Sequence, residues 1–383
     1  MISRSGINLS SAVMAHPARR ARAQALVDRH PELGARPVFD PRPAAAASAL
    51  RTARLAWAAG DDAATHHLVI QDDVALSPGF TSDLLRLIAV RPADVLCLYV
   101  DWGSLSGTAL RMAALLGHAW SPVVERGYVP TVGMVMPATL AREFAACTET
   151  GGRLSHGGVD DAAMLEFTRQ RGIVPLTPVG RLLEHEGNDS LVGNARQGRR
   201  HAATARNVDL SRTGVLALPD ALAHMPWTDG EGLLYLRDHD GPADGWRRVQ
   251  IEPLLRAANA PLAELFDALR QETEVQAGRS RLRDLLSDVL ARELWLTGLL
   301  TGHLAADTAR RASLARDRDA AMADPVAGAA LARLAPGAVR RFVPDHLLGE
   351  LGEAAEPLVR AAVRLGWDDT LGLAAVLDAA RSH

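Results

Sequence analysis

The feature that most constrains this chain is an apolar segment that runs directly into two adjacent carboxylates, His66-His67-Leu68-Val69-Ile70-Gln71-Asp72-Asp73-Val74. The β-branched Val69 and Ile70, with turn residues at Ser77-Pro78-Gly79 downstream, predict a short buried strand of a parallel sheet. Open α/β sheets bind their ligands at the carboxyl ends of the strands. We therefore expect Asp72 and Asp73 to lie at the ligand-binding edge of a sheet.

The acid pair fits two roles. Adjacent anionic side chains repel each other unless a cation lies between them, and carboxylate oxygens are good ligands for Mg²⁺ or Mn²⁺ carrying a nucleotide diphosphate. Alternatively, Asp72 and Asp73 cap the helix that follows, because Asp is favoured at helix N-caps. The pair alone does not decide between these roles, so further segments are needed.

Length and composition narrow the class of protein. A chain of 383 residues is long enough for two domains, and its net charge of -3 gives no indication of a nucleic-acid partner. Cys97 and Cys147 lie in apolar segments and form no metal-binding pair. No segment reaches the roughly 18 uninterrupted apolar residues of a membrane span. With few cysteines and no long apolar segment near its start, the chain is expected to be cytoplasmic.

The apolar pattern divides the chain into two parts. Short apolar runs alternate with amphipathic stretches from 11 to about 179, which predicts βα units and a mostly parallel sheet flanked by helices. Within this part, 103–131 is expected to be irregular apart from an optional short helix over 112–117. Beyond it, leucines recur at helical spacing. We predict an α/β domain over 1–207 and an all-α domain over 208–383, whose surface recognises an acceptor or forms a homodimer.

A second acid pair follows two glycines in Gly157-Gly158-Val159-Asp160-Asp161-Ala162. The glycines would deliver Asp160 and Asp161 to the start of a helix. Helix N-termini favour anions, so an exposed Asp there stays ionised and can accept a proton. A plain N-cap would explain either Asp taken singly.

His185 lies in Leu183-Glu184-His185-Glu186-Gly187, where we expect a turn after the last predicted strand. A neutral imidazole is a good ligand for Mn²⁺, although a lone histidine on a surface needs no ligand. Arginines lie close to these segments in the sequence: Arg19, Arg20, Arg196, Arg199 and Arg200. Their guanidinium groups would clamp a diphosphate, or they are simply solvated.

The order of these segments over residues 11–200 resembles the nucleotide-sugar-dependent glycosyltransferases of the GT-A fold. In that family an Asp-x-Asp or Glu-Asp-Asp element ends a central strand, and Gln71-Asp72-Asp73 occupies that place here, with Gln71 where an acid is common. The resemblance implies that Asp73 and His185 bind Mn²⁺ or Mg²⁺. It also implies that Gln71 and Asp72 contact the ribose or the sugar of the donor.

The resemblance further implies a reaction. A sugar would pass from a nucleotide diphosphate, with UDP favoured, to the hydroxyl of a peptide, a glycan or a small metabolite. Asp160 would remove the proton of the acceptor with inversion at the anomeric carbon, and Asp161 would bind the acceptor or exchange roles with Asp160. The arginines would neutralise the phosphates, those between 187 and 206 from a mobile flap.

Two other functions stay open. Gln71 favours a non-catalytic protein that binds nucleotide sugars or acts as a scaffold. A metal-dependent nucleotidyltransferase or phosphohydrolase is the other alternative. Against it, the chain contains no glycine-rich phosphate loop with a lysine and no further acid cluster for a two-metal site.

Overall fold

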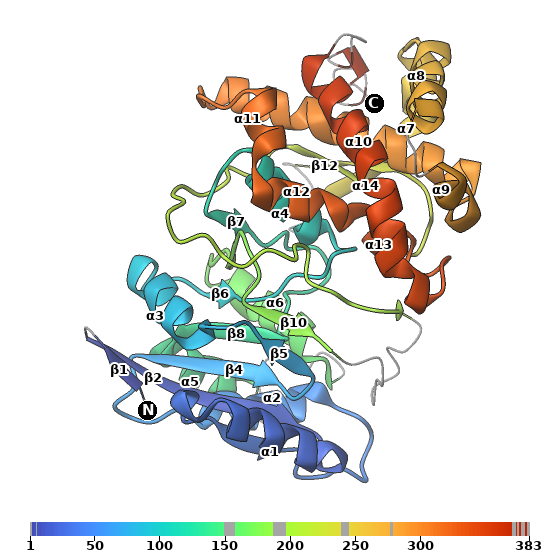
Figure 1. Cartoon of the computed structure of the whole chain (residues 1–383). Helices are drawn as coiled ribbons and strands as arrows, with labels where there is room; N and C mark the ends of the chain where they lie inside the picture. The colour runs from blue at the N-terminus through green and yellow to red at the C-terminus, as the bar shows by residue number, and fades with distance from the viewer. Residues whose placement is uncertain are drawn as a thin grey trace. The chain divides into compact units, whose positions relative to one another are not determined.

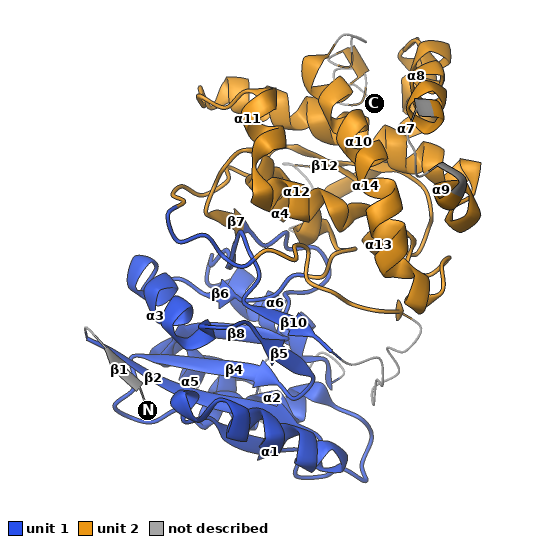
Figure 2. Ribbon diagram, in the orientation of Figure 1, with its two compact units in different colours: residues 1–100, 122–196, 207–211 blue, residues 101–121, 197–206, 212–383 orange. Residues whose placement is uncertain are grey.

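The computed structural model describes residues 2–4, 6–148, 158–186, 197–238, 245–275 and 279–369, together with 373, 375, 376 and 380. The chain forms two compact units (Figure 2). Unit 1 comprises 1–100, 122–196 and 207–211, and unit 2 comprises 101–121, 197–206 and 212–383. This division differs from the single boundary expected after residue 207, because 101–121 and 197–206 fold with the C-terminal part of the chain.

Unit 1 is built on a mixed sheet with the strand order β1-β2-β4-β8-β6-β9, in which β3 also pairs with β2 (Figure 1). Five strands run in one direction, whereas β1 and β8 run antiparallel to their neighbours. The sheet is therefore mostly parallel, as the sequence predicts. Its strands are β1 (Ile2–Arg4), β2 (Ile7–Ala15), β3 (Arg36–Phe39), β4 (His66–Gln71), β6 (Leu96–Cys97), β8 (Gly133–Pro137) and β9 (Leu176–Pro178).

The helices of unit 1 bury one face each against this sheet. They are α1 (Arg20–Arg29), α2 (Ala49–Ala58), α3 (Phe80–Val90), α5 (Ala138–Cys147) and α6 (Asp160–Gln170), with short 3-10 turns at Pro17–Arg19 and Pro31–Leu33. Trp57 of α2, Phe144 of α5 and Phe167 of α6 form one core cluster with Val69 of β4. The rings of Phe144 and Phe167 meet edge to face with centroids 5.3 Å apart. This apolar core fixes β4 in the middle of the unit.

A small antiparallel ribbon lies outside the main sheet of unit 1. β5 (Val74–Leu76) pairs with β10 (Leu183–His185), so that His185 is opposite Val74. Leu183 packs onto Gly133 at the start of β8, where any Cβ would overlap the Leu183 side chain. Gly133 is thus needed for β10 to approach the sheet. The turn predicted at His185 is wrong, because this residue closes a strand.

Unit 2 contains a buried helix where the sequence predicts an irregular stretch. α4 (Leu105–Leu115) is buried at every position, and Ser104 caps it by accepting a hydrogen bond from the backbone N–H of Gly107 at 3.0 Å. A helix buried on all sides has no polar face, so it gives no amphipathic period. That is why the sequence indicated at most a short helix over 112–117 and not the full length of α4. β7 (Trp120–Pro122) follows and ends where the chain returns to unit 1.

The prediction of an all-α C-terminal domain is wrong. Unit 2 has a three-stranded antiparallel sheet made of β11 (Ala221–His224), β12 (Leu233–Arg237) and β13 (Trp246–Gln250). These strands consist mainly of Leu, Ala and Arg, residues that also favour helices, and only β13 contains a β-branched residue, Val249. Strand propensity therefore did not separate them from their helical surroundings.

After β13 the described part of unit 2 is helical, as predicted. Its helices are α7 (Ile251–Ala257), α8 (Leu262–Val275), α9 (Arg279–Leu285), α10 (Asp288–Arg311), α11 (Arg318–Ala323), α12 (Pro325–Ala332), α13 (Leu334–Val339) and α14 (Leu348–Asp368), with a 3-10 turn at Asp345–Leu347. α10 and α14 cross in very close contact, because a Cβ on Gly302 would overlap the backbone of Val363 and a Cβ on Gly366 would overlap that of Leu299. Glycines at the crossing allow the backbones to touch.

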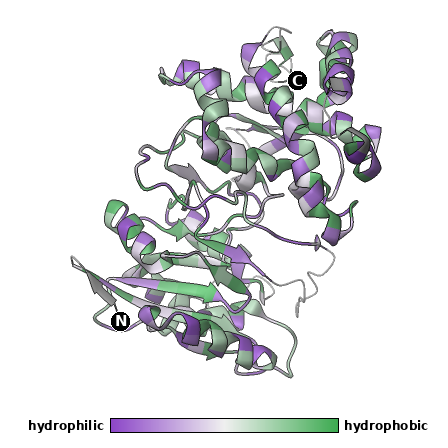
Figure 3. Ribbon diagram, in the orientation of Figure 1, coloured by the Kyte–Doolittle hydropathy of each residue, from purple (hydrophilic) through white to green (hydrophobic). Residues whose placement is uncertain are grey.

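Hydrophobic and hydrophilic residues are interleaved along the helices of unit 2 (Figure 3). Even the longest helix, α10, carries charged residues at both ends and His303 within its buried stretch. In the described part of the chain no helix has the length and apolarity required to cross a membrane.

Candidate functional site

The carboxyl ends of three neighbouring parallel strands meet at one edge of the unit 1 sheet. β2 pairs with β3 on one side and with β4 on the other. The backbone N–H of Asp40, just after β3, donates to Ala15 at 3.1 Å, and that of Asp72, just after β4, donates to Met14 at 3.1 Å. The register thus brings two acidic positions to either side of the end of β2, the edge at which such sheets bind ligands.

Asp72 and Asp73 share one cationic partner. Arg19 ends the 3-10 turn after β2, and its Nη1 lies 3.2 Å from Asp72 Oδ1 and 3.2 Å from Asp73 Oδ2. The two acidic residues are only 5% and 6% exposed. Buried carboxylates need a cation nearby, and in this structure a single guanidinium nitrogen lies between them. The structure therefore brings together the acid pair and Arg19, as the sequence predicts.

The other carboxylate oxygens of the pair find no donor in the described part of the chain. Asp72 Oδ2 and Asp73 Oδ1 are buried and accept no hydrogen bond from the described residues. Burial raises the pKa of Asp72, the charge of Asp73 raises it further, and Arg19 opposes both effects. Unsatisfied buried oxygens are costly in a folded protein. A divalent cation that accepts oxygen ligands would satisfy them, so the residues present fit a metal ion.

His185 lies next to this pair. Its Nε2 is 3.4 Å from Asp73 Oδ2, and the residue is 3% exposed. The backbone N–H of Glu186 donates to the carbonyl of Asp73 at 2.8 Å, which ties the end of β10 to the acid pair. The sequence-predicted Asp73 and His185 are thus neighbours. Even so, no group of three or more His, Cys, Asp or Glu side chains placed to hold a metal occurs among the residues that the structure describes.

Asp160 is joined to the same strand end through two residues. The backbone N–H of Gln71, the half-buried last residue of β4, donates to the carbonyl of Val132 at 2.9 Å. The adjacent Thr131 donates its hydroxyl to Asp160 Oδ2 at 2.8 Å. Asp160 is therefore bonded to Thr131, the neighbour of the residue that pairs with the end of β4. Thr131 is a site residue that the sequence did not single out.

Asp160 and Asp161 begin α6, as predicted, in different environments. Asp160 is 7% exposed; burial raises its pKa, and the hydrogen bond from Thr131 opposes the rise. Asp161 is half-buried, and burial together with the charge of Asp160 raises its pKa to about 6. A carboxyl group with such a pKa exchanges protons near neutral pH. Of the two, Asp161 is the more accessible.

The predicted arginines belong to different parts of the chain. Arg20 stacks on the ring of Phe39, with its guanidinium carbon 4.0 Å from the centroid. Arg199 and Arg200 belong to unit 2, where Arg199 lies 3.9 Å from Asp345. Arg196 lies outside the described residues, as does most of the predicted flap. Of the two predicted arginines in the described part of unit 1, Arg19 lies at the acid pair and Arg20 lies on Phe39.

A second charged pair lies at the end of β3, and the sequence analysis missed it. Asp40 accepts from Arg51 Nε at 2.7 Å and from Nη2 at 2.6 Å, and from the backbone N–H of Arg42 at 3.0 Å. Arg51 holds the pKa of Asp40 below its usual value. The signal for Asp40 was available, because it directly follows the predicted strand that ends at Phe39, as Asp72 follows β4.

Comparison with known proteins identifies no relative that would assign a role to this site. No protein-family model and no curated protein matches the chain. The function must therefore be argued from the site itself.

Proposed function

We propose that this protein is a metal-dependent glycosyltransferase that moves a sugar from a nucleotide diphosphate, preferably a UDP-sugar, to the hydroxyl of an acceptor. The observation that carries the proposal is the buried pair Asp72 and Asp73 at the end of β4, with one oxygen of each left without a donor among the residues that the structure describes. The α/β sheet with this edge is compatible with the GT-A fold, which we propose as its family.

Asp73 and His185 would hold the metal, with Asp72 beside them. When bound, Mn²⁺ or Mg²⁺ would offset the charge that grows on the departing diphosphate. Arg19 lies at the pair, so its guanidinium would be able to bind a phosphate oxygen after breaking its contacts with the two carboxylates. Gln71, at the end of the same strand, would contact the ribose or the sugar.

The acidic start of α6 would provide the base. An acceptor hydroxyl must lose a proton as it attacks the anomeric carbon. Asp161 is half-buried with a pKa of about 6, so it is ionised at neutral pH and accessible to an acceptor. Asp160 is more buried and held by Thr131. We therefore assign the proton transfer to Asp161 and the positioning of the helix start to Asp160, the exchange of roles that the sequence left open.

The proposal is tested by calorimetric titration of UDP into the protein, with Mn²⁺ and then with EDTA. We expect binding that requires Mn²⁺ and that is lost in Asp73→Asn. The matched control is Asp28→Asn, because Asp28 is an exposed carboxylate on α1 of the same unit. Product analysis with UDP-sugars then tests turnover and stereochemistry.

Two results would count against the proposed transfer of a sugar. Absence of binding with UDP, GDP and dTDP would exclude a nucleotide-diphosphate site. Metal-dependent binding without transfer or hydrolysis of any nucleotide sugar would favour the non-catalytic binding protein instead.

A further inference from the structure

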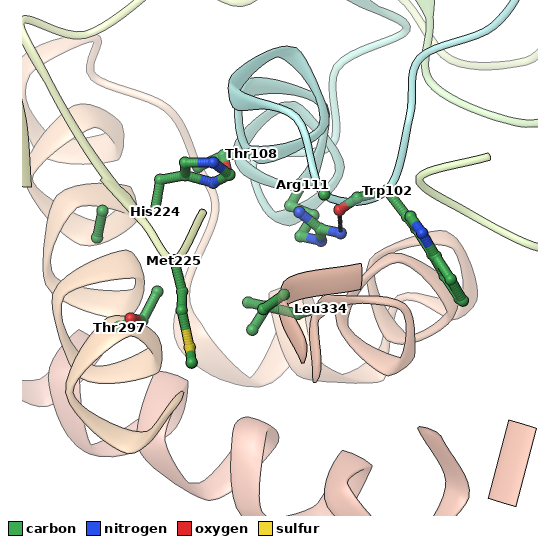
Figure 4. A pocket seen from close by; sticks show the side chains of 10 residues that line it. Trp102, Thr108, Arg111, His224, Met225, Thr297 and Leu334 are labelled. Carbon is green, nitrogen blue, oxygen red and sulfur yellow. Dashed lines mark hydrogen bonds between the residues drawn. The ribbon is translucent and has the colours of Figure 1, made fainter. Parts of the chain in front are cut away.

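Unit 2 encloses a small space that no part of the proposed reaction uses. It lies among α4, β11, α10 and α13 and has an empty volume of about 230 Å³, part of it open to solvent. Only a small part of this volume can hold the centre of a water molecule, so little more than one water-sized group fits. Figure 4 shows Trp102 and Arg111 on one side of the space and His224, Met225 and Thr297 on the other.

Arg111 is the only permanently charged side chain on this wall. It is 3% exposed. Its Nε donates to the carbonyl of Ala330 at 3.0 Å, and its Nη2 donates to the carbonyls of Trp102 and Arg333. Nη1 donates no hydrogen bond within the described part of the chain. Because Arg111 lines the space and its other nitrogens are engaged, Nη1 is the group left to face it.

The described residues do not fully balance the charge of Arg111. The nearest acid is Asp101, whose carboxylate is taken by Arg340 Nη1 at 2.6 and 2.8 Å and by the backbone N–H of Gly103 at 2.8 Å. Arg340 is itself 3% exposed. Two buried cations therefore share one buried anion. Burial lowers the pKa of Arg111 to about 10, against the opposing charge of Asp101.

A buried charge without a counter-ion is costly, and an anion next to Nη1 would remove this cost. The other polar groups on the wall do not compete for Arg111: Thr108 bonds His224 Nδ1 at 2.9 Å, and Thr297 donates to the carbonyl of Glu293 at 2.7 Å. We propose that unit 2 binds one small monovalent anion, of about the size of chloride, at Arg111 Nη1. The anion completes the ion balance of the buried cluster of Arg111, Asp101 and Arg340.

The direct test uses crystals of the full chain grown with bromide as the probe, because bromide replaces chloride and is located by its anomalous scattering. We expect a bromide peak within hydrogen-bond distance of Arg111 Nη1. Water alone at that position, at bromide concentrations that raise the melting temperature in the test described next, would overturn the proposal.

A solution test measures the melting temperature in sodium chloride and in sodium gluconate at equal ionic strength, since gluconate is too large for the space. We expect a rise in chloride alone that grows with the logarithm of the chloride concentration and reaches about 5 °C when the anion exceeds its dissociation constant about 100-fold. Equal melting temperatures in the two salts would contradict an anion site.

A variant of the wall avoids removing the buried arginine, which would disturb the fold. Ala338 lines the space, and Ala338→Val would fill part of it. The matched control is Ala335→Val, because Ala335 is equally buried on α13 and does not line the space. We expect the chloride-dependent rise to disappear in Ala338→Val and to persist in Ala335→Val. The same rise in both variants would place the anion elsewhere and overturn the assignment.

Discussion

The guanidinium of Arg19 lies 3.2 Å from the carboxylate of Asp73, the residue proposed to bind the metal. The same nitrogen is 3.2 Å from Asp72. Arg19 therefore occupies the position between the two acids at which a divalent cation would be attracted. Because cations repel each other, the proposed metal, bound at the remaining oxygens of the pair, would compete with Arg19 for their negative charge.

The first prediction follows from this competition. Arg19→Gln is expected to bind Mn²⁺ alone up to about tenfold more tightly, since the competing charge is gone. The same variant is expected to bind UDP in the presence of Mn²⁺ about tenfold more weakly, because a phosphate ligand is lost. Titration calorimetry measures both affinities.

The control for Arg19 is Arg22→Gln. Arg22 follows one turn later and pairs with Glu186 at 3.7 Å, with its side chain 36% exposed. This variant should leave the affinity for Mn²⁺ unchanged. A weaker affinity for Mn²⁺ in Arg19→Gln would mean that the arginine supports the metal site instead of competing with it.

The second prediction concerns the base. Asp161 has a pKa of about 6 in the folded protein, so kcat/KM is expected to rise with pH on an acidic limb near that value. Asp161→Asn is expected to lower kcat by about 10²-fold to 10⁴-fold. Glu166→Gln, a change on the same helix, should retain both the rate and the pH profile. A rate that survives in Asp161→Asn would move the base to Asp160.

The third prediction is the effect of Asp161 on stability. Its pKa is raised on folding, from the ordinary value of 3.8 to about 6, so the folded protein holds this proton more tightly than the unfolded chain. Stability therefore falls as pH rises from about 4 to about 6, and it stays at the lower value above that range. Asp161→Asn should be more stable than the wild type at pH 8, by about 1–3 kcal/mol, and should lose this gain below about pH 4. Urea unfolding at both pH values measures the difference.

The sequence located the acidic strand end well and its surroundings poorly. The segment that ends in Asp72 has strand propensity, and Asp72 directly follows it in the sequence. Both features are local, so β4 and the position of Asp72 at its end were predictable. The contacts that complete the site are not local. Thr131 reaches Asp160 across 29 residues, and the pairing of β10 with β5 sets His185 beside Asp73 across more than one hundred.

Two errors about unit 2 have the same physical origin. α4 is buried on every side, and β11 to β13 are built from residues that also form helices. In both cases tertiary packing decides the secondary structure. Neither the spacing of the apolar residues nor the propensity of single residues reveals that packing.

The fourth prediction tests the link between Thr131 and Asp160. Thr131→Val removes the hydrogen bond at 2.8 Å that opposes the rise in the pKa of Asp160. That pKa is expected to rise further, and the free energy of unfolding at pH 8 to fall by about 1–2 kcal/mol. Because the raised pKa destabilises only the ionised form, the loss should shrink as pH falls below the ordinary value of an Asp carboxyl.

The control for Thr131 is Thr148→Val. Thr148 is buried in the same unit, and its hydroxyl donates to the backbone carbonyls of Phe144 and Ala145. Its loss should not depend on pH, because no carboxylate is involved. A pH-independent loss in Thr131→Val would show that its hydroxyl does not act on Asp160.

The fifth prediction concerns the crossing of α10 and α14. A Cβ on Gly302 would overlap the carbonyl of Val363, so Gly302→Ala must push the two helices apart and is expected to cost at least about 2 kcal/mol in the free energy of unfolding. Gly349, at the start of α14, has no atom within 4 Å of the position of a Cβ. Gly349→Ala should therefore stabilise the helix by up to about 1 kcal/mol. Urea unfolding of both variants measures the contrast, and equal effects would mean that the helices do not touch at Gly302.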